Sequence, residues 1–219
     1  LLPATDVTPK PLLEVGGVPM VERLLRQLVG CGVDAVTVVT GWLGDLVDDH
    51  LSRLDGLPAS LSLQFMRETR PLGNIGALAG FATQQRPVLM AFGDLVTDLD
   101  FAALVRCPRA SASAITLASH HDSYRLRFGE LLVNGDRVTG YLEKPEKRYP
   151  ICSGVAVFEP RVLELIDQTR PTGISELVCA SIEQGHKVAH WPHQSFWMDI
   201  NSAETLAEAN RLLSKPSAG

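Results

Sequence analysis

Hydrophobic positions along the chain follow two periods, one typical of helices and one typical of strands. Apolar side chains recur every three or four positions in residues 20–29, and Gly30 and Gly32 end this predicted helix. Residues 35–40 form a β-branched run that predicts a buried parallel strand. The same periods predict a helix at 43–54, a strand at 61–66, a short helix at 76–83 and a buried strand at 88–92. This alternation predicts an α/β fold with a doubly wound, mostly parallel sheet covered by helices on both faces.

The pattern changes near residue 112. Residues 114–119 predict a strand, and residues 130–142 contain two alternating runs joined by Asn134-Gly135, the strongest short signal of a β-hairpin. Further strands are predicted at 151–158 and 187–191, and helices from Pro160, at 174–183 and from Ser202 to about residue 213. We expect a single domain over residues 1–219. Its parallel first half, about 1–111, accepts an antiparallel insertion and a closing helix from the second half, about 112–213.

Composition and charge exclude several classes of protein. The 219 residues are 45% hydrophobic, but no apolar run approaches the ~20 residues of a membrane span, and the first residues lack the pattern of a signal peptide. The formal net charge of −5 argues against non-specific binding to nucleic acid. We therefore expect a cytoplasmic protein with no membrane and no nucleic acid as partners. If the substrate is anionic, a few well-placed basic side chains would have to hold it against this negative net charge.

The cysteines and histidines give no sign of a metal cage. The four cysteines lie far apart, form no Cys-x-x-Cys pair and favour buried thiols in a reducing cytoplasm: Cys31, Cys107, Cys152 and Cys179. No histidine spacing would place three imidazoles on one metal ion. Ser153 lies outside a nucleophile elbow, which argues against hydrolase chemistry.

Two aspartates are candidate metal ligands. Asp94 follows an apolar strand and Gly93, and ligands of open α/β sheets bind beyond the carboxyl ends of strands. Asp199 lies far away in the sequence, in Phe-Trp-Met-Asp-Ile. Two converging carboxylates would suit Mg²⁺, which prefers hard oxygen ligands and keeps its other positions for water and phosphate. Each aspartate alone is also consistent with a turn or a helix cap.

Two lysines are candidate phosphate ligands. Lys10 stands between Pro9 and Pro11, whose fixed φ angles would let it aim a positive charge, although a solvated loop is the alternative. Lys144 ends the second hairpin strand beside Glu143. There the lysine could hold a phosphate as a point charge while the glutamate accepts hydrogen bonds from hydroxyls. The alternative is an ordinary charged strand end.

Two glycine-bearing segments suit close contact with a ligand. The turn at residues 71–76 contains Gly73 and Asn74 and would let a flat ligand such as a nucleobase approach the backbone. Gly129 follows Phe128 and fits either the entry of the hairpin or a ligand contact. Glycine-rich turns are common, so neither segment is specific by itself.

Taken in order, these segments resemble a known family. The resemblance is carried by Thr8-Pro-Lys-Pro-Leu-Leu-Glu-Val-Gly-Gly-Val-Pro-Met, Pro71-Leu-Gly-Asn-Ile-Gly-Ala-Leu, Phe92-Gly-Asp, Phe128-Gly, Glu143-Lys-Pro, Ser153-Gly-Val-Ala-Val-Phe and Trp197-Met-Asp-Ile. Over essentially its whole length the chain is similar to the sugar-1-phosphate nucleotidylyltransferases. The ordered combination carries the resemblance, and no single motif does.

The resemblance implies a fold and a reaction. The fold would be Rossmann-like, with a nucleotide-binding first half and an antiparallel sugar-binding insertion in the second. A sugar 1-phosphate would attack the α-phosphorus of a nucleoside triphosphate, giving an NDP-sugar and pyrophosphate, by positioning and charge neutralisation. Asp94 and Asp199 match the Mg²⁺ ligands of the family. Lys144 matches the lysine that holds the sugar phosphate, and Lys10 matches the lysine that stabilises the leaving pyrophosphate.

The resemblance also implies residues around the two substrates. Gly129 and Glu143 match positions that line the sugar pocket, and Ser153 lies on a strand next to the sugar. Gly73 and Asn74 match the turn beside the base. The turn and the Glu-Lys-Pro context are most similar to guanylyltransferases, which implies GTP and a mannose-, heptose- or hexosamine-type 1-phosphate.

A non-catalytic module of the same fold, which binds sugar nucleotides and regulates a partner, is the alternative function. Retention of Asp94, Lys144 and Asp199 together argues against it, because a binding module has less reason to keep both metal carboxylates. The sequence leaves the oligomeric state open, a homo-oligomer included.

The chain departs from the family pattern in three places. The first strand and the Gly-x-Gly-Thr-Arg loop of the family would lie before Leu1, so we expect a trimmed or incomplete N-terminus. Phe92 replaces a residue that is commonly polar, which removes one possible contact. Asn201 replaces a glycine, a mild change because asparagine tolerates left-handed backbone geometry.

Overall fold

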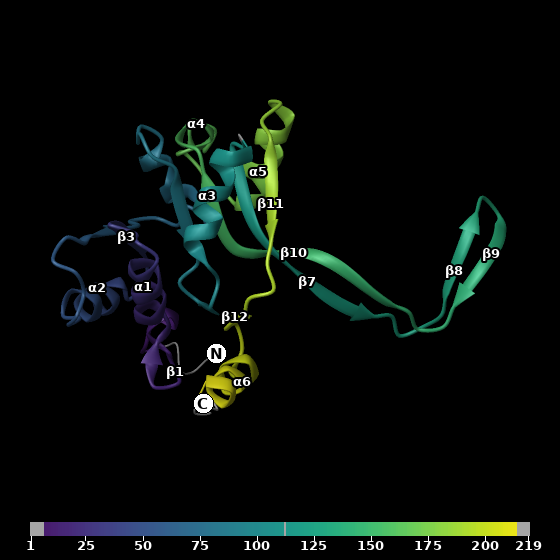
Figure 1. The fold of residues 1–219 in the computed structure, drawn as a ribbon, viewed down its shortest axis with the longest axis horizontal. Helices are drawn as coiled ribbons and strands as arrows, with labels where there is room; N and C mark the ends of the chain where they lie inside the picture. The colour runs from purple at the N-terminus through teal and green to yellow at the C-terminus, as the bar shows by residue number, and fades with distance from the viewer. Residues whose placement is uncertain (1–6, 112, 214–219) are drawn as a thin grey trace.

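The computed structural model describes residues 7–111 and 113–213 of the chain (Figure 1). Its largest sheet has four strands in the order β11-β7-β10-β5. Strand β10 is antiparallel to both β5 and β7, and β11 is parallel to β7. The bounds are Val88–Ala91 for β5, Ile115–Arg125 for β7, Glu146–Phe158 for β10 and Val188–Pro192 for β11.

Four two-stranded pairs complete the strands of the described part. The parallel pair is β3 with β4, and the antiparallel pairs are β1 with β2, β6 with β12 and β8 with β9. Their bounds are Glu14–Val15 (β1), Val18–Pro19 (β2), Ala35–Thr40 (β3), Ser62–Arg67 (β4), Leu95–Thr97 (β6), Glu130–Asn134 (β8), Arg137–Leu142 (β9) and Trp197–Asp199 (β12).

The fold is a mixed α/β fold, as expected, but the mostly parallel sheet is wrong for the described residues. Two of their seven strand pairings are parallel. The reason is that β10 returns from the predicted hairpin and lies between β5 and β7. Periodicity gives the type of an element but not its neighbour in the sheet. Strand β3 is also less buried than predicted, with only Thr40 fully covered.

The helices agree with the sequence pattern, with two omissions, at Lys10–Leu12 and at Phe101–Ser111. Their bounds are Met20–Gly30 (α1), Gly44–Ser52 (α2), Phe101–Ser111 (α3), Pro160–Leu163 (α4), Ile174–Glu183 (α5) and Ala203–Leu213 (α6), with 3-10 helices at Lys10–Leu12 (η2) and Gly76–Phe81 (η3). Helix α3 was not predicted. Its sequence signal is Asp100, whose carboxylate accepts a hydrogen bond from the backbone N–H of Ala103 (2.8 Å) as a helix cap does.

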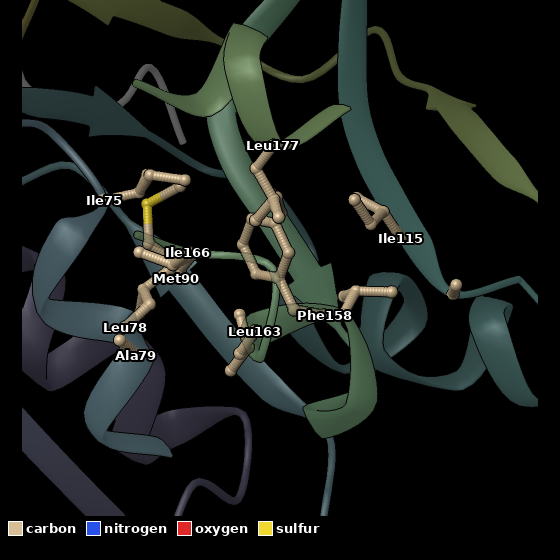
Figure 2. Close-up of a cluster of buried hydrophobic side chains, with 12 residues drawn as sticks. Ile75, Leu78, Ala79, Met90, Ile115, Phe158, Leu163, Ile166 and Leu177 are labelled. Atoms are coloured by element: carbon tan, nitrogen blue, oxygen red, sulfur yellow. The ribbon is translucent and has the colours of Figure 1, made fainter. Parts of the chain in front are cut away.

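The main core fills the space between the four-stranded sheet and the helices α4 and α5. Figure 2 shows the Phe158 ring at its centre, with Leu163 and Leu177 on either side, and all three side chains are almost fully buried. A second cluster packs α1 and α3 against the opposite face through side chains such as Leu24, Phe101 and Val155. The sheet is therefore anchored from both faces near the end of β5.

Strands β7 and β10 continue beyond this core as a two-stranded ribbon, and the β8–β9 hairpin lies at its far end (Figure 1). Strand β11 pairs with β7 only up to Ser119, and β5 pairs with β10 only from Val155 onward. Residues 121–125 and 146–150 therefore pair only with each other. We call residues 121–150 the arm and the remainder the body.

Two further expectations concern membranes and thiols. No helix in the described part of the chain is long and apolar enough to cross a membrane. All four cysteines are free, but the expectation of four buried thiols is wrong, because Cys31 and Cys107 are only half-buried and Cys152 and Cys179 are exposed. A single cysteine carries no sequence pattern that predicts which side of an element it faces.

Candidate functional site

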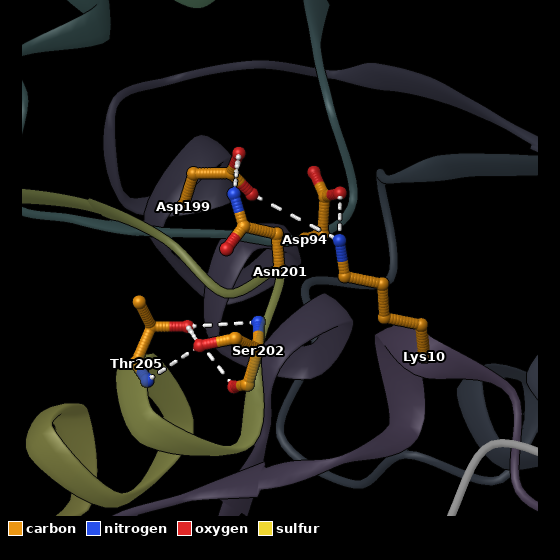
Figure 3. Close-up of polar contacts among 6 residues, drawn as sticks. All are labelled: Lys10, Asp94, Asp199, Asn201, Ser202 and Thr205. Atoms are coloured by element: carbon orange, nitrogen blue, oxygen red, sulfur yellow. Dashed lines mark hydrogen bonds and ion pairs between the residues drawn. The ribbon is translucent and has the colours of Figure 1, made fainter. Parts of the chain in front are cut away.

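Three of the residues selected from the sequence converge in the body. The Nζ atom of Lys10 lies 2.6 Å from Oδ2 of Asp94 and 3.9 Å from Oδ1 of Asp199 (Figure 3). Lys10 opens η2, Asp94 lies between β5 and β6, and Asp199 ends β12. We call these three residues the carboxylate site.

A short ladder brings the two carboxylates together. Strands β6 and β12 are antiparallel, with Asp199 opposite Leu95. The backbone N–H of Ile200, whose side chain is fully buried, donates to the carbonyl oxygen of Asp94 (3.1 Å). The two aspartates are thus fixed by backbone hydrogen bonds and a buried anchor, and neither depends on a flexible loop.

Two prolines flank Lys10 and shape the 3-10 turn that it opens. Pro9 is buried and extended (φ −60°, ψ 139°), and its carbonyl oxygen accepts from the N–H of Leu12 (2.8 Å). Pro11 faces Gly93, where a Cβ atom would lie 3.7 Å from the proline ring. This packing aims the lysine stem at the carboxylates.

The C-terminal helix fastens the loop that follows Lys10. The side-chain oxygen of Asn210 in α6 accepts from the N–H of Gly16 (2.9 Å), and its amide nitrogen donates to the carbonyl oxygen of Glu14 (3.2 Å). One side chain therefore joins the first hairpin to the last helix.

The carboxylate site carries more negative than positive charge. Burial raises the pKa of Asp199, and the neighbouring Asp94 raises it further, while Lys10 and the amide of Asn201 oppose the shift. Oδ1 of Asp199 is buried and accepts no hydrogen bond, because Lys10 at 3.9 Å is too distant. Two carboxylates thus share one ammonium group.

This donor set fits a hard divalent cation. Mg²⁺ is usually held by one or two protein carboxylates and keeps waters and substrate phosphates in its remaining positions. The orphaned oxygen of Asp199 beside Asp94 meets that requirement. No group of three or more His, Cys, Asp or Glu side chains in the described residues could form a complete metal cage.

The predicted base-binding turn packs closely against the loop before α5. Gly73 has φ +81°, and a Cβ atom there would lie 2.4 Å from the carbonyl oxygen of Thr172, so only glycine fits. Asn74 accepts from the N–H of Ile174 through its side-chain oxygen (3.0 Å). The turn is therefore rigid, and this side-chain oxygen of Asn74 already has a partner.

A cavity of about 270 Å³ lies beside this turn, lined by residues 66–70, Leu72, Gly76, Ala77, Ala79, Gly80, Asp167 and Gln168. It includes Glu68, which the sequence analysis missed. Burial raises the pKa of Glu68, and a hydrogen bond from the backbone of Leu72 partly opposes this. The signal for Glu68 in the sequence was the run of charged residues that follows the predicted strand at 61–66.

Ser153 is the buried centre of a partly exposed cluster next to β12. Its Oγ is hydrogen-bonded to Nδ1 of His120 (2.9 Å) and Nε2 of His193 (2.8 Å), and its side chain is not exposed. We call these three residues the histidine cluster. Burial lowers the pKa of both histidines, which keeps them neutral at pH 7. The hydroxyl of Ser153 is therefore already engaged within the protein.

The histidine cluster supports the strand that carries Asp199. The indole N–H of Trp197 donates to the carbonyl oxygen of Ser153 (2.7 Å), and the rings of Trp197 and His120 lie 4.3 Å apart. Trp197 begins β12, two residues before Asp199. Nothing in the sequence indicated that these two histidines support the site, because only the fold brings them together.

The remaining predicted residues lie on the arm. Glu143 and Lys144 join β9 to β10, and Gly129 precedes β8, so all three sit at the base of the hairpin, far from β12 (Figure 1). Tyr141 covers Gly129 and donates to Glu143 (3.1 Å). The structure therefore does not bring Gly129, Glu143 and Lys144 to the carboxylate site of the same chain.

Comparison with known proteins gives a match over nearly the whole chain. A family model described as nucleotidyl transferase matches residues 1–215.

Three curated relatives are similar in sequence. Mannose-1-phosphate guanylyltransferase of Mycobacterium tuberculosis is 29% identical over 211 residues, which are 93% of this chain and 58% of that protein. Mannose-1-phosphate guanylyltransferase catalytic subunit beta of Drosophila pseudoobscura pseudoobscura is 28% identical over 207 residues, 91% of this chain and 55% of that protein. N-acetylmuramate alpha-1-phosphate uridylyltransferase of Neisseria meningitidis serogroup B is 26% identical over 222 residues, 96% of this chain and 91% of that protein. The chain spans little more than half the length of the two guanylyltransferases.

Solved structures share the fold. HddC from Yersinia pseudotuberculosis superposes with a TM-score of 0.71 at 20% identity, covering 93% of this chain and 89% of that one. The same protein is also known in complex with GMP-PN. A putative glucose-1-phosphate thymidylyltransferase from Bacillus anthracis gives a TM-score of 0.72 at 20% identity, covering 100% and 92% of the two chains.

Proposed function

Because the chain belongs to the nucleotidyl transferase family, we propose that it transfers a nucleotidyl group from a nucleoside triphosphate to a sugar 1-phosphate. The observation that carries this proposal is the convergence of Lys10, Asp94 and Asp199 at the end of β5. These residues lie far apart in the sequence, and their chemistry suits polyphosphate. The products would be an NDP-sugar and pyrophosphate.

The reaction joins two anions, so neutralising charge is the main task of the site. An oxygen of the sugar phosphate forms a bond to the α-phosphorus, and the bond from the α-phosphorus to the bridging oxygen of pyrophosphate breaks. Asp94 and Asp199 would hold Mg²⁺, which when bound supplies positive charge to the phosphates. Lys10 would stabilise the charge that develops on the leaving pyrophosphate.

The other substrate contacts follow the sequence assignment. Lys144 would hold the phosphate of the sugar 1-phosphate, with Glu143 and Gly129 beside the sugar. Gly73 and Asn74 would lie beside the base, because their turn is rigid and borders the cavity. The strand that carries Ser153 would lie next to the sugar. The hydroxyl of Ser153 would not contact the sugar, because it is already hydrogen-bonded within the histidine cluster.

Guanine is the base that this cavity supports best. A carboxylate such as Glu68 can accept from the N1–H and the exocyclic amino group of guanine at the same time. Adenine presents no such pair of donors on one edge. Similarity to mannose-1-phosphate guanylyltransferases supports the same choice, and we extend it to a mannose-, heptose- or hexosamine-type 1-phosphate.

The alternative function is a non-catalytic module that binds or senses sugar nucleotides. The orphaned oxygen of Asp199 favours catalysis, because binding of a sugar nucleotide alone gives no reason to leave a buried carboxylate oxygen without a donor.

One assay tests the proposal. Full-length protein with Mg²⁺, each nucleoside triphosphate in turn and a panel of sugar 1-phosphates should release pyrophosphate, most rapidly with GTP. Silence for every pair would overturn the enzymatic function. Glu68→Gln should then reduce the preference for GTP over the other triphosphates, whereas Asp167→Asn, at another position in the same lining, should leave the preference intact.

A further inference from the structure

The arm presents apolar side chains that no other described segment of the chain covers. Ten of the eighteen large hydrophobic residues exposed in the described part lie on it: Tyr124, Leu126, Phe128, Leu131, Leu132, Val133, Val138, Tyr141, Leu142 and Tyr149. Phe128 is 80% exposed and Tyr141 61% exposed. An exposed apolar surface of this kind usually marks an interaction site.

Both faces of the hairpin are apolar. Leu131 pairs with Tyr141 on β8 and β9, while Leu132 and Leu142 come from the positions that alternate with them. A hairpin that faced water on one side would carry polar residues there. A two-stranded ribbon in water is also only marginally stable without a covering surface. The hairpin is therefore built to be covered on both faces.

The arm cannot supply that cover by folding back onto its own body. Its strands are the same β7 and β10 that form the middle of the four-stranded sheet, and their register is unbroken from the pair Glu146–Arg125 to the pair Cys152–Ser119. This ladder directs the arm away from β12 (Figure 1). Folding back would require several ladder hydrogen bonds to break.

The charges of the arm and of the carboxylate site indicate which surface the arm contacts. The arm contains six basic and five acidic residues, so it is net positive in a chain of net charge −5. The carboxylate site has two carboxylates for one ammonium group. Lys144, at the base of the hairpin, holds the left-handed φ of +44°, a conformation that non-glycine residues adopt mainly where surroundings or function require it.

We propose that two copies of this chain form a dimer in which each arm packs against the body of the other copy and brings Lys144 and Glu143 to the carboxylate site there. The role of Lys144 in this proposal rests on the proposed function. A reciprocal exchange closes with two-fold symmetry and buries both arms, so no arm remains free for further association. The complete site would then consist of Lys10, Asp94 and Asp199 from one copy and Lys144 from the other.

Light scattering on the full-length protein tests the dimer. The wild type should have the mass of two chains. Phe128→Asp, which places a charge in the apolar surface of the arm, should have the mass of one chain with an unchanged circular dichroism spectrum. The matched control is Trp42→Asp, an aromatic residue of the body that is 82% exposed, and it should remain dimeric. A monomeric wild type, or a dimeric Phe128→Asp variant, would overturn the proposal.

Mixed dimers test the exchange of Lys144. Asp94→Asn and Lys144→Ala should each be inactive alone. Co-expressed with two different tags and purified together, they should recover activity, because one site in the mixed dimer keeps both residues. Purified through both tags, each mixed dimer has one intact site of two, so the activity should be about half that of the wild type. The control, a chain carrying both substitutions co-expressed with Asp94→Asn, should stay inactive.

The outcomes separate the two proposals. An active wild type with a silent mixture would place Lys144 in its own chain's site, overturning the exchange while the nucleotidyl transfer stands. A wild type that is silent with all substrates would overturn the transfer, and the effect of Phe128→Asp on mass would still decide whether the arm makes the dimer.

Discussion

The carboxylate site and the arm carry the residues proposed for one reaction, but the fold holds them in different ways. Lys10, Asp94 and Asp199 are fixed by prolines, a short ladder and the buried Ile200, so each is supported from several sides. Lys144 and Glu143 lie at the end of a ribbon whose strands support only each other. The body therefore positions its charged side chains through its own packing, whereas the arm requires contact with another surface to hold its charged side chains in place.

The largest expected effect is the loss of activity without loss of the body fold. Asp199→Asn should lower kcat by about a thousandfold, because it removes one of the two carboxylates proposed to hold Mg²⁺. Its stability should not fall, because burial and Asp94 already oppose the ionised form of Asp199. Pyrophosphate release and urea denaturation measure the two effects. Asp98→Asn, an exposed aspartate near Asp94, is the control and should keep its activity.

Substitutions in the body core and on the arm should differ in their effect on the free energy of unfolding. Phe158→Ala opens a cavity at the centre of the main core and should lower the free energy of unfolding by about 3 to 4 kcal/mol. Val138→Thr on the arm, made in the monomeric Phe128→Asp background where this side chain is exposed, should cost well under about 1 kcal/mol. Denaturation in urea compares them directly. Equal losses would mean that the arm belongs to the same cooperative core as the body.

Two glycines with positive φ sharpen the contrast. Gly73→Ala should cost about 3 kcal/mol, because strain at φ +81° adds to a Cβ atom only 2.4 Å from the carbonyl oxygen of Thr172. Gly135→Ala, in the hairpin turn at φ +62° with no neighbour within 4 Å, should cost only about 1 kcal/mol. Thermal unfolding of both variants checks the difference, and a Gly73→Ala protein as stable as Gly135→Ala would contradict the packing of the turn.

The smallest effect is a pH dependence that belongs to the histidine cluster. Burial lowers the pKa of His120 and His193 below the ordinary value of 6.5, so the folded state binds fewer protons than the unfolded state in this range. Stability from this source is complete above pH 6.5 and falls as the pH drops through the region between the unfolded and folded pKa. Melting temperatures between pH 7 and 5 should show this fall. His193→Gln should flatten it, whereas His121→Gln, on the exposed side of β7, should not.

The sequence was most informative where local chemistry decides local structure. The hairpin signal near Asn134 and the glycine of the 71–76 turn act through φ angles and nearest neighbours, and the structure bears out the hairpin and the turn they predict. The hairpin loop itself is shifted by one residue, to Gly135 and Asp136. The family resemblance was confirmed by the match over residues 1–215.

The errors concern relations between distant segments. A strand pattern cannot tell that β10 will lie between β5 and β7, so the mostly parallel sheet was wrong. Likewise, His120 and His193 are 73 positions apart, and only the fold places both on the hydroxyl of Ser153. The roles assigned to the site residues stay predictions, which the experiments above test.

The contact of Asn210 with Gly16 and Glu14 gives the order in which the site can be assembled. Lys10 is synthesised early. The loop that follows it is held by Asn210, which lies 194 positions after Gly16 and must first be synthesised and fold into α6. Such a long-range closure is slow relative to local helix formation. During synthesis the protein would therefore acquire its core first and its carboxylate site last, after translation has passed α6.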